Sequence, residues 1–244
     1  MPMQIQTTTP KMQHRKQEMP DMASAVERRF FQTQCRAKKS DDGKMEIGGY
    51  GAIFNRFTNM GWYAEVVMPG FFDGIKDDRC ACLFNHSESQ ILGRKKNGTL
   101  LLRVDDNGLE YVAKMPEHRA DVYELIEGGY VYESSFGFTV ASYKWGELDR
   151  SELSEQLSEA DLDALAYRGK VPVLYLERGR ELFDVSPVTF AAYEGTTTNT
   201  RFSRSMFDEW RGANPPAVEN TTITETPVFS VYDLDLRLKE LELI

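Results

Sequence analysis

Histidine is the side chain best suited to acid–base catalysis near neutral pH, and the chain has three of them: His14, His86 and His118. His14 lies in a polar N-terminal stretch, and His118 lies in the first turn of an expected helix. His86 follows the apolar run CACLF, at a point where the chain is expected to leave a sheet. It is the candidate general base, although a lone histidine at a strand end can equally have a structural role.

The segment VYESSFGF (residues 131–138) offers a candidate nucleophile. Strand side chains alternate between faces, so Ser134 shares one face with the two phenylalanines, and Ser135 shares the other with Gly137. The phenylalanine face is the expected core face. A glycine beside Ser135 leaves room for another backbone to approach, which suits a peptide-binding groove. The alternative is a polar outer face with a glycine that lets the strand bend.

A hydroxyl is a useful nucleophile at neutral pH only when a base removes its proton, and a third group must hold that base in the right tautomer. The segment ELFDVS (residues 181–186) offers a carboxylate for this purpose. Phe183 and Val185 make the better core face of an expected strand, so Asp184 points away from it. An ordinary surface carboxylate is the alternative reading of this position.

Other chemistries find less support in the sequence. Cys80, Cys82 and His86 are close together, but the pattern lacks a second ligand pair at zinc spacing, and Cys35 is remote. The glycines of GGYG (residues 48–51) lack the Lys-Ser/Thr that a phosphate-binding loop requires. We therefore expect no metal and no cofactor.

Composition narrows the class of protein. The chain has 244 residues, of which 41% are hydrophobic, enough for a substantial core. Its formal charge of −9 is unfavourable for general nucleic-acid binding. Three cysteines form no disulfide framework, and we see neither an apolar signal segment nor a membrane-spanning run. These features predict a soluble protein of a reducing compartment, the cytosol, without nucleic-acid or membrane partners.

The candidate residues lie among short predicted strands. The expected strands cover residues 27–36, 45–54, 62–68, 79–84, 100–104, 109–115, 131–145, 171–176 and 181–190. Residues 100–115 form the strongest hairpin signal, because two alternating runs flank the turn DDNG. The Gly48-Gly49 pair predicts a bulge or tight bend. Together these elements predict a mainly β fold, a β-barrel of about six to eight strands with peripheral α-helices.

Four helices are expected in addition to the strands, at residues 71–76, 116–127, 151–168 and 206–211. The segment 116–127 has apolar residues at helical spacing between an initial proline and a terminal Gly-Gly pair. Within 151–168, Ser158 to Asp161 resembles a capping signal.

Several blocks, taken in order, resemble the prohead maturation proteases of tailed phages. These blocks are GYGAIFN, EVVMPGFF, LFNH, ILGR, GTL with GLE, SSFGF and ELFDVSPVTFAAY. The resemblance covers about residues 27 to 200. It implies a β-barrel wrapped in helices, distantly similar to the herpesvirus assembly proteases. It also implies that His86 is the base, that Ser135 is the nucleophile and that the acid lies on the strand of Asp184.

The chain departs from the family pattern at three positions near the candidate site. Ser87 replaces the aspartate that usually follows the histidine, and Ser134 replaces an apolar residue before the nucleophile. Asp184 stands where the family commonly has glutamate. The identity of the third residue therefore stays open, with Glu181 and Glu177 as alternatives to Asp184.

Composition and the resemblance together predict a domain organisation and a role. Residues 1–26 are expected to form a disordered leader, 27–203 the protease domain, and 204–244 a C-terminal tail with an amphipathic segment that could dock to the capsid. The implied activity is a serine endopeptidase that cleaves the scaffold, or a scaffold-like region of the major capsid protein, and itself. It would act in the host cytoplasm, inside the immature capsid, with these proteins as partners; a homo-oligomer is also open.

Two rival functions are weighed against this one. A non-catalytic assembly or scaffolding factor could keep the barrel and only bind capsid protein. A cytosolic esterase is less favoured, because the chain lacks a Gly-x-Ser-x-Gly elbow.

Overall fold

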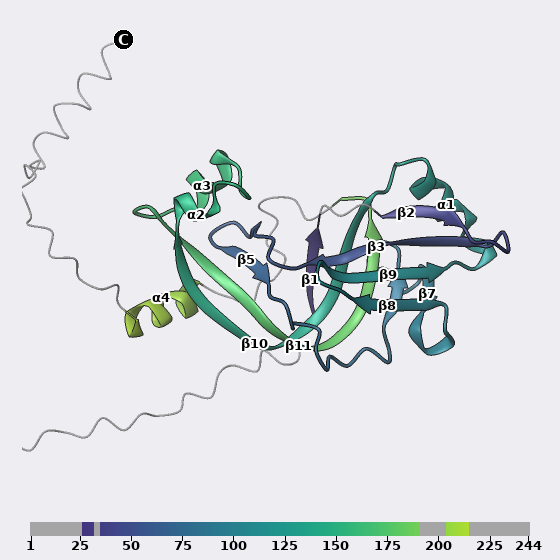
Figure 1. Cartoon of the computed structure of the whole chain (residues 1–244), viewed down its shortest axis with the longest axis horizontal. Helices are drawn as coiled ribbons and strands as arrows, with labels where there is room; N and C mark the ends of the chain where they lie inside the picture. The colour runs from purple at the N-terminus through teal and green to yellow at the C-terminus, as the bar shows by residue number, and fades with distance from the viewer. Residues whose placement is uncertain (1–25, 32–34, 191–203, 215–244) are drawn as a thin grey trace, which may run out of the picture. The chain divides into compact units, whose positions relative to one another are not determined.

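The computed structural model describes residues 26–31, 35–190 and 204–214, whose helices and strands are shown in Figure 1. One sheet has the order β1 (Glu27–Phe31), β10 (Glu133–Asp149), β11 (Lys170–Val188), β5 (Ala64–Val67) and β4 (Thr58–Asn59). Two further strands of this sheet are β6 (Ala81–Leu83), paired with β11, and β7 (Ile91–Arg94), paired with β6. The second sheet has the order β2 (Arg36–Lys39), β3 (Met45–Ile53), β9 (Gly108–Lys114) and β8 (Leu100–Val104).

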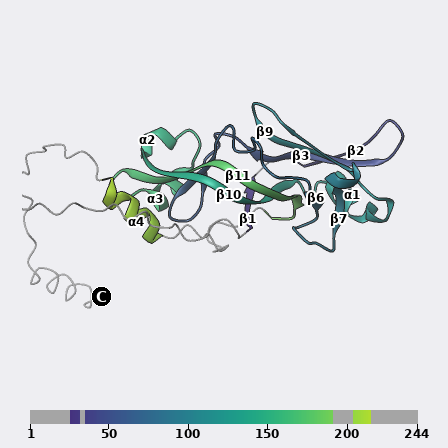
Figure 2. The same ribbon diagram turned by 90° about the horizontal axis from the view of Figure 1, so that it is seen from below.

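The predicted mainly β architecture is confirmed, but a closed barrel is not. The described strands pair as two separate sheets, and neither sheet closes on itself. The two sheets pack closely where glycines face the neighbouring sheet: a Cβ on Gly51 of β3 would lie 3.1 Å from Val185 of β11, and one on Gly93 of β7 would lie 3.1 Å from Ala113 of β9. Figure 2 shows the β2–β3–β9 layer beside the strands β6 and β7.

Strands β10 and β11 form the long antiparallel ribbon of Figure 1, paired from Glu133–Val188 to Asp149–Lys170. The two strands expected at 171–176 and 181–190 are therefore one continuous strand. No proline or turn motif ends it between them, and the irregularity is taken up by register shifts in the β10–β11 pairing, between the pairs Gly137–Asp184 and Tyr143–Leu176. Such bulges bend a strand without ending it.

The face of β10 that carries the phenylalanines is core, as predicted. Phe136 and Phe138 have no exposed surface, and their rings stack with centroids 4.5 Å apart. Phe71 meets the ring of Phe138 edge-on at 5.3 Å. Edge-on and offset aromatic pairs are favourable arrangements, so this cluster fixes the strand that also carries the candidate nucleophile.

The prediction of a helix at residues 71–76 is wrong. Residues 69–74 form successive turns, in which the N–H groups of Phe71 and Asp73 donate to the carbonyls three residues earlier. Gly70 and Gly74 adopt positive φ values of 87° and 70°. These left-handed positions interrupt a helix, and glycine reaches them without steric penalty.

The other helices follow the prediction in part. Helix α1 (Ala120–Glu127), preceded by the 3₁₀ turn η2 (Glu117–Arg119), and α4 (Arg204–Ala213) lie where helices were expected. The single helix expected at 151–168 is instead two short helices, α2 (Arg150–Leu153) and α3 (Glu159–Leu165). The capping signal explains the break: Ser158 and Asp161 form a reciprocal capping box that begins α3. A further 3₁₀ turn, η1 (Lys95–Asn97), follows β7.

The bulge expected at the Gly48-Gly49 pair lies slightly further along β3. The pairing of β3 with β9 is regular through both glycines and shifts between Tyr50 and Ala52. The predicted hairpin is confirmed as β8 and β9, which pair from Leu100–Ala113 to Val104–Leu109.

Contacts along the chain divide it into two units, residues 1–208 and 209–244, and the two sheets belong to the first. The predicted disordered leader and the amphipathic C-terminal segment lie outside the described residues. Within the part that the structure describes, no helix is both long and apolar enough to cross a membrane.

Candidate active site

The structure brings three of the sequence-predicted residues into direct contact. His86 Nε2 lies 2.5 Å from Ser135 Oγ, and His86 Nδ1 lies 2.5 Å from Asp184 Oδ1. The histidine is 49 residues from the serine and 98 from the aspartate along the chain. One imidazole therefore connects a hydroxyl on one nitrogen with a carboxylate on the other, an arrangement that can activate the hydroxyl as a nucleophile.

Neighbouring strands position all three side chains. Ser135 lies on β10 and Asp184 on β11, two strands that are paired antiparallel. Asp184 also pairs with Ala81 of the short strand β6, which runs parallel to β11. Because β6 pairs with β11, it ends beside that strand. The turn that follows β6 therefore places His86 next to the Asp184 carboxylate.

The turn that carries His86 has an uncommon backbone. Asn85 and His86 have φ values of 52° and 56°, both in the left-handed region. Asparagine tolerates this region better than most residues, because its short polar side chain bonds to the nearby backbone. Two successive residues of this kind persist only when their surroundings hold them in place.

Asn85 provides that restraint through three hydrogen bonds to the end of β11. Its backbone N–H donates to the Pro187 carbonyl at 3.0 Å, and its Nδ2 donates to Thr189 Oγ1 at 3.1 Å. In return, the N–H of Thr189 donates to Asn85 Oδ1 at 2.8 Å. The histidine turn is thus fastened to the strand that carries Asp184. Sequence reasoning missed this role, although Asn85 belongs to the LFNH block.

The site is more deeply buried than the alternation of β10 and β11 suggested. Ser135 has no exposed surface, and the side chains of His86 and Asp184 are 9% and 4% exposed. The prediction that Ser135 and Asp184 lie on outer faces needs this correction: their face is covered as well. Interactions between charges are stronger in such surroundings than in water.

The alternatives for the nucleophile and the acid lie elsewhere. The hydroxyl of Ser134 contacts the hydroxyl of Tyr111 at 3.0 Å, on the other face of β10. Glu177 is exposed and Glu181 is half-buried. Among the candidate acids, Asp184 is the one whose carboxylate oxygen contacts the histidine ring.

Ser186, which sequence reasoning did not single out, also belongs to this cluster. Its hydroxyl donates to Asp184 Oδ1 at 2.6 Å and is fully buried. The alternation that put Ser186 on the face of Asp184 was the available signal for this contact.

The three cysteines are free thiols and all are buried. Burial raises the pKa of the Cys35 thiol to about 11 and raises the pKa values of Cys80 and Cys82 as well. They therefore resemble small apolar core residues more than nucleophiles. Across the described ranges, no group of three or more His, Cys, Asp or Glu side chains could hold a metal ion.

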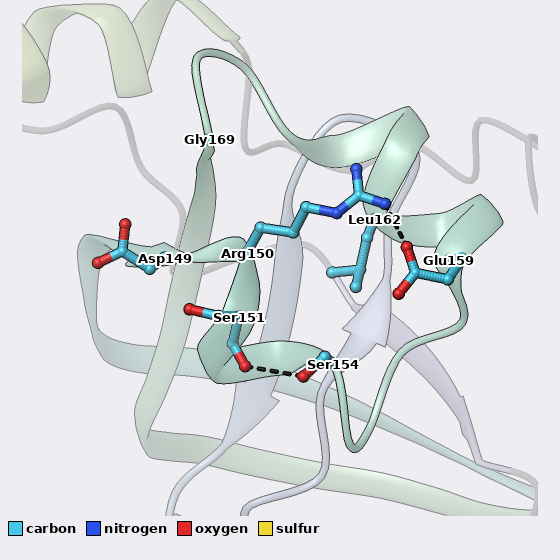
Figure 3. Close-up of a pocket in the computed structure, with 7 residues that line it drawn as sticks. All are labelled: Asp149, Arg150, Ser151, Ser154, Glu159, Leu162 and Gly169. Carbon is cyan, nitrogen blue, oxygen red and sulfur yellow. Dashed lines mark hydrogen bonds and ion pairs between the residues drawn. The ribbon is translucent and has the colours of Figure 1, made fainter.

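A hollow lies beside α2 and α3 (Figure 3). It is lined by Asp149, Arg150, Ser151, Ser154, Glu159, Leu162 and Gly169. Arg150 bridges Glu159 and Asp163 at 2.5 Å each, so the guanidinium at this hollow is already paired with carboxylates. The hollow contains none of the candidate catalytic residues.

Comparison with protein families places these residues in context. The family model described as Caudovirus prohead serine protease matches residues 32–209, a range that contains His86, Ser135 and Asp184. Neither the curated proteins nor the solved structures yielded a match.

Proposed function

Because the chain belongs to the Caudovirus prohead serine protease family, we propose that it is a serine endopeptidase that cuts capsid-assembly proteins through Ser135, His86 and Asp184. The observation that carries the proposal is the contact of one imidazole with both Ser135 Oγ and Asp184 Oδ1. Serine, histidine and an acid occur in this arrangement in hydrolases of unrelated folds. Such a triad is recognised by its geometry and by the roles of its three residues.

In the proposed mechanism, Ser135 Oγ attacks the carbonyl carbon of the scissile peptide while His86 Nε2 takes its proton. The tetrahedral intermediate then breaks the C–N bond, and His86 returns the proton to the leaving amine. This leaves an acyl ester on Ser135. Water, deprotonated by His86, attacks the ester in the same way and releases the new carboxyl terminus.

Asp184 sets the tautomer of the histidine in this scheme. Its carboxylate accepts the Nδ1–H of His86, which leaves the lone pair of Nε2 directed at Ser135. When His86 becomes an imidazolium, the nearby negative charge stabilises it. Because Ser135 has no exposed surface, binding of a peptide chain requires a local opening of the site.

The proposed substrates are the scaffold, or the scaffold-like region of the major capsid protein, and the enzyme itself. The enzyme would act inside the prohead in the host cytoplasm, with these proteins as partners and with self-association open. Residues 27–203 would carry the protease activity, and 204–244 would recruit the enzyme to the shell. A distant likeness to the herpesvirus assembly proteases is also part of the proposal.

Co-expression with the major capsid protein and scaffold of the phage tests this function. Ser135→Ala should abolish their cleavage and should also abolish labelling by a rhodamine fluorophosphonate. Loss of the serine or the histidine of such a triad typically lowers the rate by about a million-fold. Ser134→Ala is the matched control and should cleave normally. If folded Ser135→Ala protein still processed the capsid proteins, the proposal would be wrong. A folded wild-type protein that binds capsid protein but is neither labelled nor able to cleave it would favour the assembly factor.

A further inference from the structure

Two donors share one oxygen of Asp184. His86 Nδ1 lies 2.5 Å from Oδ1, and the hydroxyl of Ser186 donates to the same atom at 2.6 Å. Ser186 has no exposed surface, and Asp184 is 3% exposed. A buried carboxylate has lost its hydrating water and depends on such protein donors to satisfy its oxygens.

The sheet gives Ser186 a fixed place beside the nucleophile. It lies two residues after Asp184 on β11, so both side chains share a face, and it is the direct ladder partner of Ser135 on β10. The two paired serines nevertheless have different partners: Ser135 contacts the imidazole, whereas Ser186 contacts the carboxylate.

We propose that Ser186 is a positioning residue for the reaction, an inference that rests on the proposed peptidase function. Its hydroxyl fixes the rotation of the Asp184 carboxylate so that Oδ1 faces His86 Nδ1. Without that donor the carboxylate can turn about its terminal bond, a soft torsion, and the histidine loses its orientation. Ser186 thus acts on Ser135 only through Asp184 and His86.

The rate of fluorophosphonate labelling measures this effect without a known peptide substrate, because labelling requires an activated Ser135. Ser186→Ala should lower the second-order labelling rate by about 10- to 100-fold, the size expected for a lost hydrogen bond to a charged group. Ser186→Thr, which keeps the hydroxyl, should recover part of that loss. Equal labelling rates for wild type and Ser186→Ala would overturn the assignment.

A double-mutant comparison separates positioning from a general structural role. In an Asp184→Asn background, Ser186→Ala should cause no further decrease, because residues that act as one unit are not additive. The same fold-decrease in both backgrounds would show that Ser186 only supports the fold. If Ser186→Ala does not fold, Ser186→Cys supplies a weak donor of similar size and is subject to the same comparison.

The control on Ser135 keeps the two hypotheses apart. Normal labelling of Ser135→Ala would refute the peptidase function itself. An unlabelled Ser135→Ala together with a fully active Ser186→Ala would refute only the role of Ser186.

Discussion

Gly137 and Asp184 face each other across the β10–β11 ladder, and the carboxylate of Asp184 fills the space that a side chain at position 137 would occupy. A Cβ built on Gly137 would overlap Asp184 Oδ2 and would lie 3.2 Å from Asp184 Cγ. The absence of a side chain at Gly137 thus leaves the room that the Asp184 carboxylate needs. Sequence reasoning assigned the free space to an approaching backbone, whereas the structure fills it with this side chain.

Gly137→Ala should therefore displace the Asp184 carboxylate. We expect a decrease in activity of about 100-fold, since small misplacements of catalytic groups have effects of this order. Overpacking should also lower the free energy of unfolding by about 1–3 kcal/mol. Fluorophosphonate labelling and urea unfolding measure the two effects. Gly212→Ala is the control, because its added Cβ meets nothing within 4 Å beyond its chain neighbours and the backbone of its own helix. Wild-type labelling of folded Gly137→Ala would contradict the prediction.

The identity of the acid can be tested directly. Asp184→Asn keeps the size of the side chain but cannot hold His86 in the same tautomer, so we expect a rate decrease of about 10,000-fold. Glu177→Gln and Glu181→Gln should retain nearly full activity, because neither carboxylate accepts the histidine N–H. Labelling rates of the three folded variants decide the matter: a large loss in either glutamine variant, with Asp184→Asn active, would reassign the acid.

The hydrogen bonds of Asn85 predict a local effect on the histidine turn. Asn85→Ala removes both side-chain bonds to Thr189 and places alanine at a positive φ of 52°. We expect a stability loss of about 1–3 kcal/mol and a clear decrease in labelling rate. Asn85→Gly should recover the backbone part of the loss but not the hydrogen bonds. Thr189→Val should have a smaller effect, because the backbone N–H at position 189 still donates to Asn85. Labelling rates equal to wild type in all of these variants would show that the turn does not contribute to catalysis.

Local patterns predicted much of the fold because they reflect local physics. The alternation of β10 identified Phe136 and Phe138 as core residues, and both are fully buried. The turn DDNG predicted the hairpin, and the capping signal at Ser158 marks a true helix start. The helix expected at 71–76 failed because two glycines there take left-handed conformations that no period of apolar residues reveals.

The candidate site shows what local sequence patterns cannot predict. Alternation separated Ser135 from the core phenylalanines, but it could not show that the second face of β10 is also covered. The contacts of His86 join residues 49 and 98 positions apart, and these depend on the parallel pairing of β6 with β11. No short-range signal encodes such a pairing, so the resemblance to a family was needed to connect the three residues.

The cysteines should be unreactive in the folded protein. Burial raises the pKa of Cys35 to about 11, so at pH 8 only about one thiol in a thousand is ionised. Reactivity toward iodoacetamide should increase only as the pH rises toward that value, because the thiolate is the reacting species. At pH 8, mass spectrometry should find no alkylated cysteine in the folded protein, and fluorophosphonate labelling of that protein should be unchanged. Urea-unfolded protein should react with iodoacetamide at all three thiols. Rapid inactivation of folded protein would instead implicate a cysteine in the reaction.

A buried ion-pair cluster joins two strands that are not neighbours in the sheet. Arg29 of β1 binds Glu65 of β5 through Nε and, at 2.8 Å, through Nη2, and it binds Glu27 at 3.0 Å. Its guanidinium also lies 5.5 Å from the centre of the Phe138 ring. Burial alone would lower the pKa of Arg29, but the two carboxylates outweigh it and raise the pKa, so the side chain stays charged.

Glu65→Gln should therefore be strongly destabilising, because it leaves a buried cation without its main partner. We expect a decrease of about 3–5 kcal/mol in the free energy of unfolding, measured in urea. The exposed pair of Lys44 and Asp42, 2.6 Å apart, is the matched control, and Asp42→Asn should leave stability nearly unchanged. Replacing both Arg29 and Glu65 by apolar residues should restore much of the loss, because no charge is then left buried. A Glu65→Gln protein as stable as wild type would show that the cluster does not hold β1 against β5.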